Sequence, residues 1–508
     1  MIAPTDWIAL VASLAALGGL VAIGEGLRRL GWSSAATRHL IHIGVGVFVA
    51  STPVWFTGPL PVAVLAVLFV GANGWAKARH WFPGMHAARP ESWGTVAFPL
   101  AVLPALAATW ALAPDRMPAF QAAFVVLALA DPAAAWVGRA VSSVDLRPPP
   151  DRKTLAGSAA FAVVAAGATA GCLLASGAGG GGALVAGSAA VGLIAAAVEV
   201  ISGRGWDNFF VVQAVVVAVL AVEEAGGLPV LGAVIASGGF VTGAYRSHVL
   251  DRLGAIGGGL LAVTLLVLGG WAWAVPAAAF FVLSSALSKL DRSSAADATA
   301  PTVAPRTPDD ERGRTLRQVL ANGGVAWLCL IAAFLVPDLE AGDGGMLLYA
   351  AYVGAFATAT ADTWATEIGT RMPGPPVHIA TLQRVPAGTS GAISLAGTVA
   401  GAAGALCITA LAAAASPGLS NPLVPNPAAA IPALAAAGFI GMMMDTVLGA
   451  TVQVRYRDPR TGRLVEEPPD PSSPPVRGWR AIDNDGVNAL ATTVGSFLAA
   501  GLALLLPV

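Results

Sequence analysis

The feature that most constrains this chain is a succession of long apolar segments. Its 508 residues contain about sixteen runs of roughly 20 mostly apolar residues, the length that an α-helix needs to cross a membrane. A helix is favoured in lipid because it satisfies every backbone polar group internally. Only 11% of the residues are charged, whereas a typical soluble protein carries about 25%. The sequence therefore predicts an all-α, polytopic integral membrane protein.

The expected spans form two sets of eight. Those of the first half lie near 6–27, 40–57, 59–76, 94–113, 118–138, 155–177, 181–201 and 207–224, and those of the second near 228–245, 254–270, 271–288, 319–337, 345–370, 391–415, 428–452 and 487–507. Basic residues mark cytoplasmic loops, and 27 of the 28 Lys and Arg residues fall in odd-numbered loops, with only Arg116 in an even one. We therefore expect a multi-pass protein of the cell (plasma) membrane with both termini outside. Two long Pro-rich cytoplasmic loops, 289–318 and 454–486, are expected to be flexible or loosely ordered connections.

Charge and cysteine content exclude several classes of protein. The formal net charge is −1, so the chain has no basic surface for nucleic acid. The three cysteines, Cys172, Cys329 and Cys407, lie far apart in apolar stretches and form neither a disulfide framework nor a metal-binding pattern. No GxxxxGK[ST] motif is present, which excludes a P-loop nucleotide site.

Acidic residues inside or beside the spans are the candidate functional groups. An ionisable group at membrane depth is costly and is a functional candidate by default. The alternative is a buried acid paired with one of the few arginines. In the first half these acids are Asp131, Glu199 and Asp207, the last followed by Asn208. In the second half they are Asp362, Glu367 and Asp445, with Asp483, Asn484, Asp485 and Asn488 around the start of the last span.

The two halves share an order of elements. Asp131 and Gly138 in one half have the same spacing as Asp362 and Gly369 in the other. A loop follows, which we expect to end in a hydroxyl- and glycine-rich cluster that opens the sixth span of each half; the clusters are 153–158 and 388–391. Each half then supplies an acid and an Asp-Asn element. This order predicts a parallel tandem repeat with domains at residues 1–225 and 226–508.

These groups suit phosphoryl transfer, which needs little beyond positioning and charge neutralisation. Carboxylates hold Mg²⁺ beside substrate phosphates; the metal candidates are Asp131, Glu199, Asp207, Asp362, Glu367 and Asp445, of which Asp131, Asp207, Asp362 and Asp445 are the candidate catalytic residues. Helix N-termini and cations bind phosphate; the candidates are Arg139, Lys153, Thr154, Gly157, Ser158, Asn208, Arg384, Gly388, Thr389, Gly391, Asn484 and Asn488. His42 is a candidate for proton transfer. The alternatives are basic residues that only mark topology, glycines that only pack helices, and a histidine with a structural hydrogen bond.

Motifs in the first half carry a family resemblance. They are Arg38-His39-x-x-His42, Ala130-Asp131, Lys153-Thr154-x-x-Gly157-Ser158, and Glu199 with Asp207-Asn208. Over residues 1–225 the chain thereby resembles the membrane lipid-alcohol kinases, the family of phytol kinase and dolichol kinase. That resemblance implies a CTP-dependent kinase acting on a polyisoprenoid alcohol.

The second half carries a different and more extensive set of motifs. They are Gln318-x-x-x-Asn322-Gly323, Thr360-x-Asp362-Thr363-Trp364-x-x-Glu367-x-Gly369, Gly388-Thr389-Ser390-Gly391, Asp445-x-x-x-Gly449-Ala450-x-x-Gln453, and Asn484-x-x-Val487-Asn488. From about residue 226 onward the chain resembles the family of plant phytyl-phosphate kinase and transmembrane protein 19. That resemblance implies phosphorylation of a prenyl monophosphate to the diphosphate.

Together these features predict a bifunctional isoprenoid-alcohol salvage kinase. It would phosphorylate phytol or a similar prenol twice, using Mg²⁺ with CTP or another nucleoside triphosphate. Its expected partners are the prenyl alcohol, the prenyl phosphate, the nucleotide and membrane lipid. Two alternatives stay open: an ion-coupled secondary transporter, which midplane acids also suit, and a cytidylyltransferase acting on a lipid phosphate.

Overall fold

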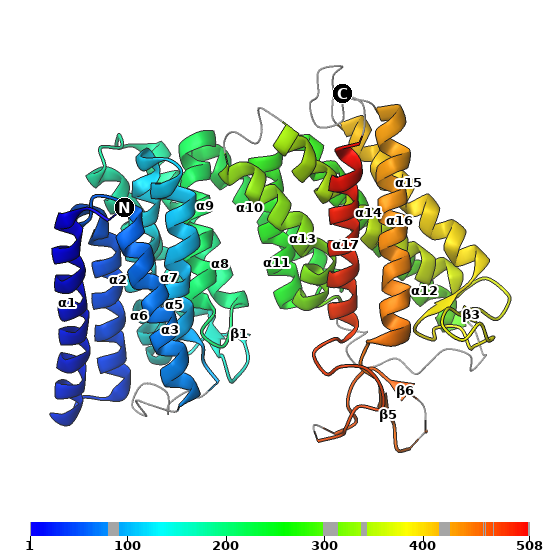
Figure 1. Ribbon diagram of the computed structural model, residues 1–508, viewed down its shortest axis with the longest axis horizontal. Coiled ribbons are helices and arrows are strands. Elements are labelled where there is room, and N and C mark those ends of the chain that lie inside the picture. Colours follow the sequence, from blue (N-terminus) through cyan, green and yellow to red (C-terminus); the bar gives the residue numbers. More distant parts are fainter. Residues whose placement is uncertain are drawn as a thin grey trace. The chain divides into compact units, whose positions relative to one another are not determined.

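The computed structural model of the chain is almost entirely helical (Figure 1). It describes residues 2–79, 91–297, 313–336, 343–415, 427–460, 462, 464–470 and 472–505. The chain divides into two compact units, Met1–Phe240 (unit 1) and Val241–Val508 (unit 2). Fourteen helices of the described residues are long and apolar enough to cross a membrane. The predicted all-α, polytopic fold is therefore confirmed.

The helices and strands follow one another in simple order. Unit 1 contains α1 (Pro4–Arg29), α2 (Ser34–Trp55), α3 (Pro59–Ala78), α5 (Gly94–Leu106), η1 (Ala107–Ala111), η2 (Pro114–Arg116), α6 (Met117–Ala140), β1 (Asp145–Arg147), β2 (Lys153–Thr154), α7 (Leu155–Ala175), α8 (Gly182–Ile201) and α9 (Asp207–Ala225). Helix α10 (Gly227–Arg246) crosses the division between the units. Unit 2 continues with α11 (Arg252–Thr264), η3 (Leu265–Gly269), α12 (Gly270–Asp297), α13 (Leu316–Leu335), α14 (Asp343–Gly369), β3 (Val377–His378), β4 (Ala392–Ile393), α15 (Leu395–Ala415), α16 (Pro427–Thr451), β5 (Tyr456–Arg457), β6 (Leu464–Val465) and α17 (Asn484–Ala503).

The expected count of about sixteen spans differs from the fourteen at two places. The fourteen membrane-length helices do not include α2, and they include Arg252–Ser288 as one continuous helical segment. This segment reverses direction at Gly270, which has a φ of 59°. Both of its ends lie beside Arg314: the Asp251 amide donates to the Arg314 carbonyl (3.0 Å), and the Arg314 guanidinium donates to the Ser288 hydroxyl (3.2 Å). The segment therefore makes two passes, while the total of sixteen stays a prediction.

The units divide within α10, whereas the predicted domain boundary lies at the end of α9. Gly227, the first residue of α10, approaches α8 so closely that a Cβ there would lie 2.0 Å from the Ala183 carbonyl oxygen. Because this contact ties the start of α10 to α8, that part of the helix packs with unit 1.

Of the two long loops, only the second lies mainly within the described residues; the loop at 289–318 lies largely outside them. The loop at 454–486 contains the β5–β6 hairpin and folds back on the end of α16. There the Val454 amide donates to the Ile482 carbonyl (2.8 Å) and the Arg455 amide to the Arg477 carbonyl (2.9 Å). The described part of this loop therefore has defined hydrogen bonds to the end of α16 and a hairpin of its own, which is more order than the expected flexible or loosely ordered connection.

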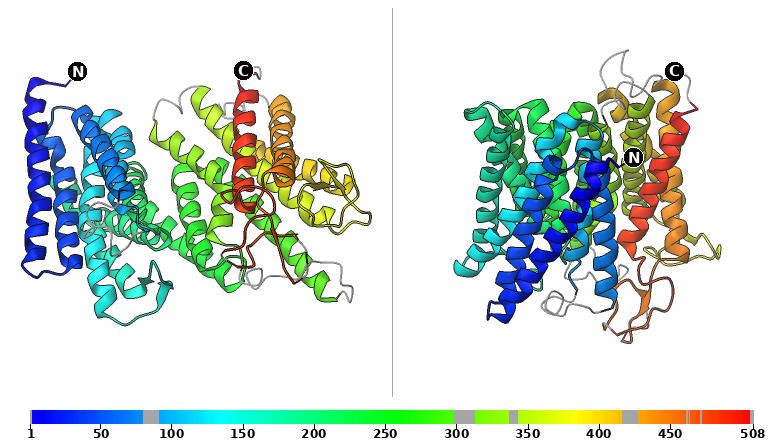
Figure 2. Two further views of the ribbon diagram at one scale, coloured as in Figure 1. Left: turned by 60° about the horizontal axis from the view of Figure 1, so that its bottom comes forward. Right: turned by 60° about the vertical axis from the view of Figure 1, so that its left-hand side comes forward.

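One helix lies at the centre of each unit and carries its predicted aspartate. In unit 1, α6 packs against α2, α7 and α9, with Phe120 and Phe124 fully buried. In unit 2, α14 packs against α12, α13, α15, α16 and α17, and α17 runs beside α16 in every view (Figures 1 and 2). Tyr349 and Tyr352 of α14 are buried, and both hydroxyls donate to backbone carbonyls of α12. Asp131 and Asp362 are thus held on helices that each pack against at least three others of their unit.

The same close helix crossing follows that aspartate in both units. In unit 1, Gly138 of α6 meets Gly157 of α7, and a Cβ on Gly157 would lie 2.9 Å from the Ala134 carbonyl oxygen. In unit 2, Gly369 of α14 meets Gly397 of α15, and a Cβ on Gly397 would lie 2.8 Å from the Ala365 carbonyl oxygen. Only glycine allows backbones to approach this closely. The predicted Asp-to-Gly spacing is therefore the spacing of a helix-packing contact.

The caps of these helices correct one detail of the predicted repeat. Thr154 caps α7 by accepting from the Gly157 amide (3.2 Å), and Ser394 accepts from the Gly397 amide at the start of α15 (3.1 Å). Thr154 is the last residue of the β1–β2 hairpin, and Ser394 directly follows the β3–β4 hairpin. The counterpart of the 153–158 cluster is therefore Ser394–Gly397. The 388–391 cluster does not open α15, since it precedes β4, and the sequence pattern missed this because both clusters are short and rich in glycine.

Gly157→Val is expected to destabilise unit 1. Its new side chain would meet backbone atoms of Ala134 and Gly138, and overpacking of this kind costs about 1–3 kcal/mol. Thermal unfolding of the detergent-solubilised protein should show a lower midpoint. Gly167→Val is the matched control, because it lies on the same helix and a Cβ there meets nothing within 4 Å. Equal midpoints for the two variants would contradict this account of the crossing.

Candidate functional site

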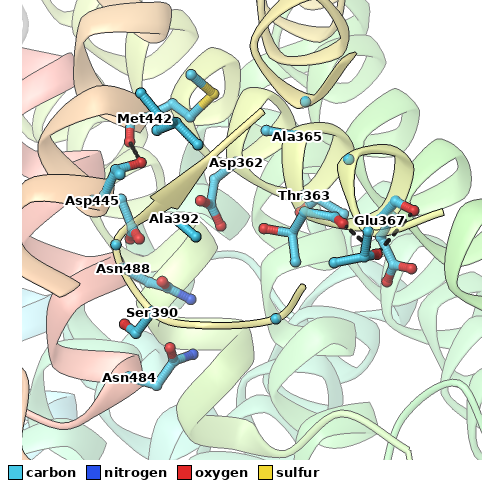
Figure 3. A pocket seen from close by; sticks show the side chains of 18 of the residues that line it. Asp362, Thr363, Ala365, Glu367, Ser390, Ala392, Met442, Asp445, Asn484 and Asn488 are labelled. Atoms are coloured by element: carbon cyan, nitrogen blue, oxygen red, sulfur yellow. Dashed lines mark hydrogen bonds between the residues drawn. The ribbon is translucent and has the colours of Figure 1, made fainter. Parts of the chain in front are cut away.

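Unit 2 contains a cavity of about 1010 Å³ (Figure 3). Its wall gathers most of the predicted residues of the second half from four parts of the chain: Asp362 and Glu367 on α14, Gly388, Thr389 and Gly391 in the following loop, Asp445 on α16, and Asn484 and Asn488 on α17. Tertiary packing thus brings together residues that are as far apart in the sequence as Asp362 and Asn488. The cavity is the candidate site of unit 2.

Asp362 and Asp445 face the same part of this cavity (Figure 3). Their carboxyl groups are close enough to interact electrostatically. Asp445 Oδ2 is buried and has no hydrogen-bond partner among the described residues. Burying a carboxylate oxygen without a partner is costly, and a cation bound between these two groups would offset that cost.

Glu367, also predicted as a metal ligand, already has partners. Its carboxylate accepts from the Ser288 hydroxyl (2.8 Å) and from the Arg371 guanidinium (3.5 Å). The Arg371 guanidinium also donates to the Leu287 carbonyl (2.7 Å), which fixes it beside α12. The geometry therefore favours Asp362 and Asp445 over Glu367 as ligands of a cation.

The 388–391 loop passes close to α16. Gly388 and Gly391 both have a φ of 80°, and a Cβ on Gly391 would lie 2.5 Å from that of Ala450. The Thr389 hydroxyl donates to the Pro386 carbonyl (2.7 Å), and the Ser390 hydroxyl donates to Gln453. The loop backbone therefore lines the cavity in a conformation that only glycine readily adopts at these two positions.

The start of α17 completes the wall. Asp483 caps this helix by accepting from the Gly486 amide (3.0 Å), and it also accepts from the Arg317 guanidinium (2.6 Å). Asn484 and Asn488 are four residues apart, so they lie on one face of the helix, and both line the cavity. The predicted Asp-Asn element therefore has two roles, since Asp483 caps the helix and the asparagines face the cavity.

A magnesium ion fits the residues present. The described residues contain no group of three or more His, Cys, Asp or Glu side chains that could hold a metal. Mg²⁺ does not need one, because it is commonly held by one or two carboxylates and completes its octahedron with waters and substrate phosphates. Asp362 and Asp445, with an unsatisfied carboxylate oxygen beside the cavity, match that donor set.

In unit 1 a buried lysine joins two of the predicted acids. The Lys153 ammonium, in β2, donates to Glu199 at the end of α8 and to Asp207 at the start of α9, the latter at 3.1 Å. Burial lowers the pKa of Lys153, but the Asp207 and Glu199 carboxylates raise it by more, so its pKa lies above the ordinary value. Lys153 is therefore charged at physiological pH and compensates part of the acidic charge. Unit 2 differs, because none of the described Lys or Arg residues forms an ion pair with Asp362 or Asp445.

Asp131 belongs to the same cluster. It interacts electrostatically with Lys153, and one carboxylate oxygen lies 4.0 Å from His42 Nε2. The same His42 nitrogen lies 3.1 Å from the Leu127 carbonyl oxygen. His42 therefore has a structural hydrogen bond, the alternative to a role in proton transfer, although it lies beside the predicted catalytic acid.

The remaining candidate phosphate-binding residues of unit 1 differ in their burial and in their contacts. Gly157 packs against α6, and the hydroxyl of Ser158 is buried without a hydrogen-bond partner in the described part of the chain. The Asn208 side chain donates to the Gly94 carbonyl (3.0 Å) and so ties α9 to α5. Arg139 is exposed.

Some residues of the unit 2 site differ from the predicted set. Arg384 is exposed and does not line the cavity. Gln318, Asn322, Arg314 and Arg455 do line it, although they were not predicted as site residues. Gln318 and Asn322 form an i, i+4 amide pair in an apolar helix, and this pattern could have identified them from the sequence.

Comparisons with known proteins concern unit 2. The family described as integral membrane protein DUF92 matches residues 235–496. Protein PGR of Arabidopsis thaliana is 28% identical over 288 residues, which cover 52% of this chain and 93% of that protein. An uncharacterized membrane protein of Methanocaldococcus jannaschii is 28% identical over 255 residues (50% of this chain, 85% of that protein), and one of Synechocystis sp. is 27% identical over 245 residues (48% and 78%). No solved structure matches. With its cavity-bearing unit matched almost throughout, the chain belongs to the DUF92 family of integral membrane proteins.

Proposed function

We propose that unit 2 is a phosphotransferase that converts a prenyl monophosphate to the diphosphate. The observation that supports this most is the pairing of Asp362 and Asp445 at a cavity whose wall also contains the 388–391 loop and two asparagine side chains. Such a site combines ligands for a hard cation with donors for phosphate oxygens. The resemblance to plant phytyl-phosphate kinase agrees with it.

The residues of this chain have separable parts in that reaction. Asp362 and Asp445 would hold Mg²⁺, which neutralises phosphate charge when bound. Asn484, Asn488 and the 388–391 backbone would orient the nucleotide. An oxygen of the acceptor phosphate attacks the γ-phosphorus as the bond to the nucleoside diphosphate breaks, and the prenyl diphosphate and nucleoside diphosphate are released.

The lining of the cavity also suits a lipid acceptor. Phe280 of α12 and Met442 and Met443 of α16 contribute apolar surface from membrane-spanning helices. Methionine side chains adapt to irregular apolar ligands. An acceptor with an anionic head and an apolar tail would therefore find both kinds of surface in one cavity.

We also propose that unit 1 performs the first phosphorylation, of the prenyl alcohol. The support is the cluster of Asp131, Glu199 and Asp207 around Lys153, together with the resemblance to phytol kinase and dolichol kinase. Asp131 and Asp207 would hold Mg²⁺, and Lys153 would neutralise phosphate charge. CTP is the expected donor, and both sites would face the cytoplasm from the cell membrane.

The test uses the full chain in lipid nanodiscs. Phytol, or phytyl monophosphate, is supplied with Mg²⁺ and either CTP or ATP, and the lipid products are resolved by mass. We expect phytol to give the monophosphate and then the diphosphate, and added monophosphate to give the diphosphate alone. A CDP-linked lipid would instead favour the cytidylyltransferase. Ion-dependent uptake into vesicles without any phosphorylated lipid would favour the transporter and contradict the proposal.

A further inference from the structure

Gln453 lies behind the cavity wall at the end of α16, where only 1% of it is exposed. It is not a lining residue, yet it contacts three that are. The hydroxyl of Ser390 and the guanidinium of Arg455 (3.3 Å) both donate to Gln453 Oε1, and Gln453 Nε2 donates to Asn484 Oδ1 (3.2 Å). One buried amide thus joins the 388–391 loop, the segment after α16 and the start of α17.

The direction of these hydrogen bonds follows from Arg455. A guanidinium can only donate, so the Gln453 atom that faces it must be the oxygen. The Gln453 nitrogen is then on the other side and needs an acceptor, which Asn484 provides with its own oxygen. Because Asn484 Oδ1 accepts from Gln453, the Asn484 amide nitrogen, Nδ2, is the atom that can donate into the cavity.

The surrounding backbone keeps Gln453 in this position. The Val454 amide donates to the Ile482 carbonyl (2.8 Å), and the Trp479 amide donates to the Val452 carbonyl (3.0 Å). Gly478, with a φ of 78°, approaches so closely that a Cβ there would lie 2.1 Å from the Gln453 carbonyl oxygen. The backbone of Gln453 is therefore fixed against the segment that precedes α17, and the hydrogen bonds of its side chain with Ser390, Arg455 and Asn484 set the direction of the amide.

We propose that Gln453 is a positioning residue that makes Asn484 a hydrogen-bond donor to an anionic phosphate oxygen in the cavity. This inference rests on the proposed phosphotransfer in unit 2 and names the chemistry of one subsite there. Asp362 and Asp445 attract the cation, while Asn484, turned by Gln453, contacts the anion. An asparagine in the opposite orientation would present an oxygen and repel phosphate.

Gln453→Glu tests the orientation with almost no change of shape. A carboxylate still accepts from Ser390 and Arg455 but cannot donate to Asn484, so the Asn484 amide turns over and presents its oxygen to the cavity. Binding of inorganic pyrophosphate with Mg²⁺ is measured by calorimetry on the full chain in nanodiscs. Every sample carries Asp131→Asn, so that unit 1 contributes less to the signal. The dissociation constant should rise about 10- to 100-fold, the range for one hydrogen bond to a charged group.

A second variant separates positioning from general damage. Asn484→Ala removes the donor itself and should weaken pyrophosphate binding to a similar extent, which keeps the inference testable if Gln453→Glu does not fold. In the Asn484→Ala background, Gln453→Glu should have little further effect, because both changes remove the same contact. Gln213→Glu is the matched control: the Gln213 amide donates to the Ala101 carbonyl (3.0 Å) within unit 1, and Gln213 is not one of the lining residues of this cavity.

The outcomes distinguish this inference from the proposed function. A folded Gln453→Glu variant with unchanged pyrophosphate binding and an unchanged KM for the nucleotide overturns the positioning role, even if the wild type phosphorylates lipid. Fully additive effects of the two substitutions also overturn it. Weakened pyrophosphate binding in a protein that phosphorylates no lipid supports the anion subsite and contradicts the phosphotransferase.

Discussion

Asp362→Asn is expected to stop the proposed pathway at the monophosphate. The substitution preserves the size of the side chain but removes the charge that a divalent cation needs, at a site where Asp445 supplies the neighbouring carboxylate. Loss of one such electrostatic contact typically lowers a rate by about 10²- to 10³-fold. Protein supplied with phytol, Mg²⁺ and nucleotide should therefore accumulate phytyl monophosphate, measured by mass spectrometry of the extracted lipids.

Glu367→Gln provides the comparison for this result. Glu367 lies on the same helix and lines the same cavity, but Ser288 and Arg371 already contact its carboxylate. Its substitution should reduce diphosphate formation less than Asp362→Asn does. If a folded Asp362→Asn variant lost both phosphorylations together, the two-site proposal would fail and one shared site would be the better account.

Asp131→Asn is expected to block the first phosphorylation and spare the second. In unit 1 the acids Glu199 and Asp207 are bridged by Lys153, whereas the ion-pair contact of Asp131 among the described residues is with His42, at 4.0 Å. Asp131 is therefore the acid whose charge is most available to a cation, and its loss should lower alcohol phosphorylation about 10²- to 10³-fold. Conversion of added phytyl monophosphate to the diphosphate should continue at the wild-type rate.

Asp115→Asn is the control for that variant. Asp115 is an exposed acid in the η2 turn directly before α6, so its substitution removes the same charge from the same unit without touching the cluster. Both activities should stay at the wild-type level. An Asp131→Asn protein that still phosphorylates phytol normally would show that the first site lies elsewhere.

The sequence by itself determined the class of fold and the acids of the candidate sites. Apolar segments of span length admit few structures besides helices, because lipid offers no partner for an unpaired backbone group. Asp131, Asp362 and Asp445 are candidates for the same reason, since a charge at membrane depth is costly and is a functional candidate by default. Both inferences depend on local composition, which can be read from the sequence without knowing which residues are in contact in the folded protein.

The tertiary structure alone decided which of these acidic side chains have a hydrogen-bond or ion-pair partner. Lys153 reaches Glu199 and Asp207, and Ser288 reaches Glu367, across large separations in sequence, and no local pattern encodes such pairings. The same holds for Gln453, which the sequence shows only as one residue of a motif. Its role follows from a hydrogen bond to Asn484, thirty-one positions away, because the direction of an amide is set by the donors and acceptors packed around it.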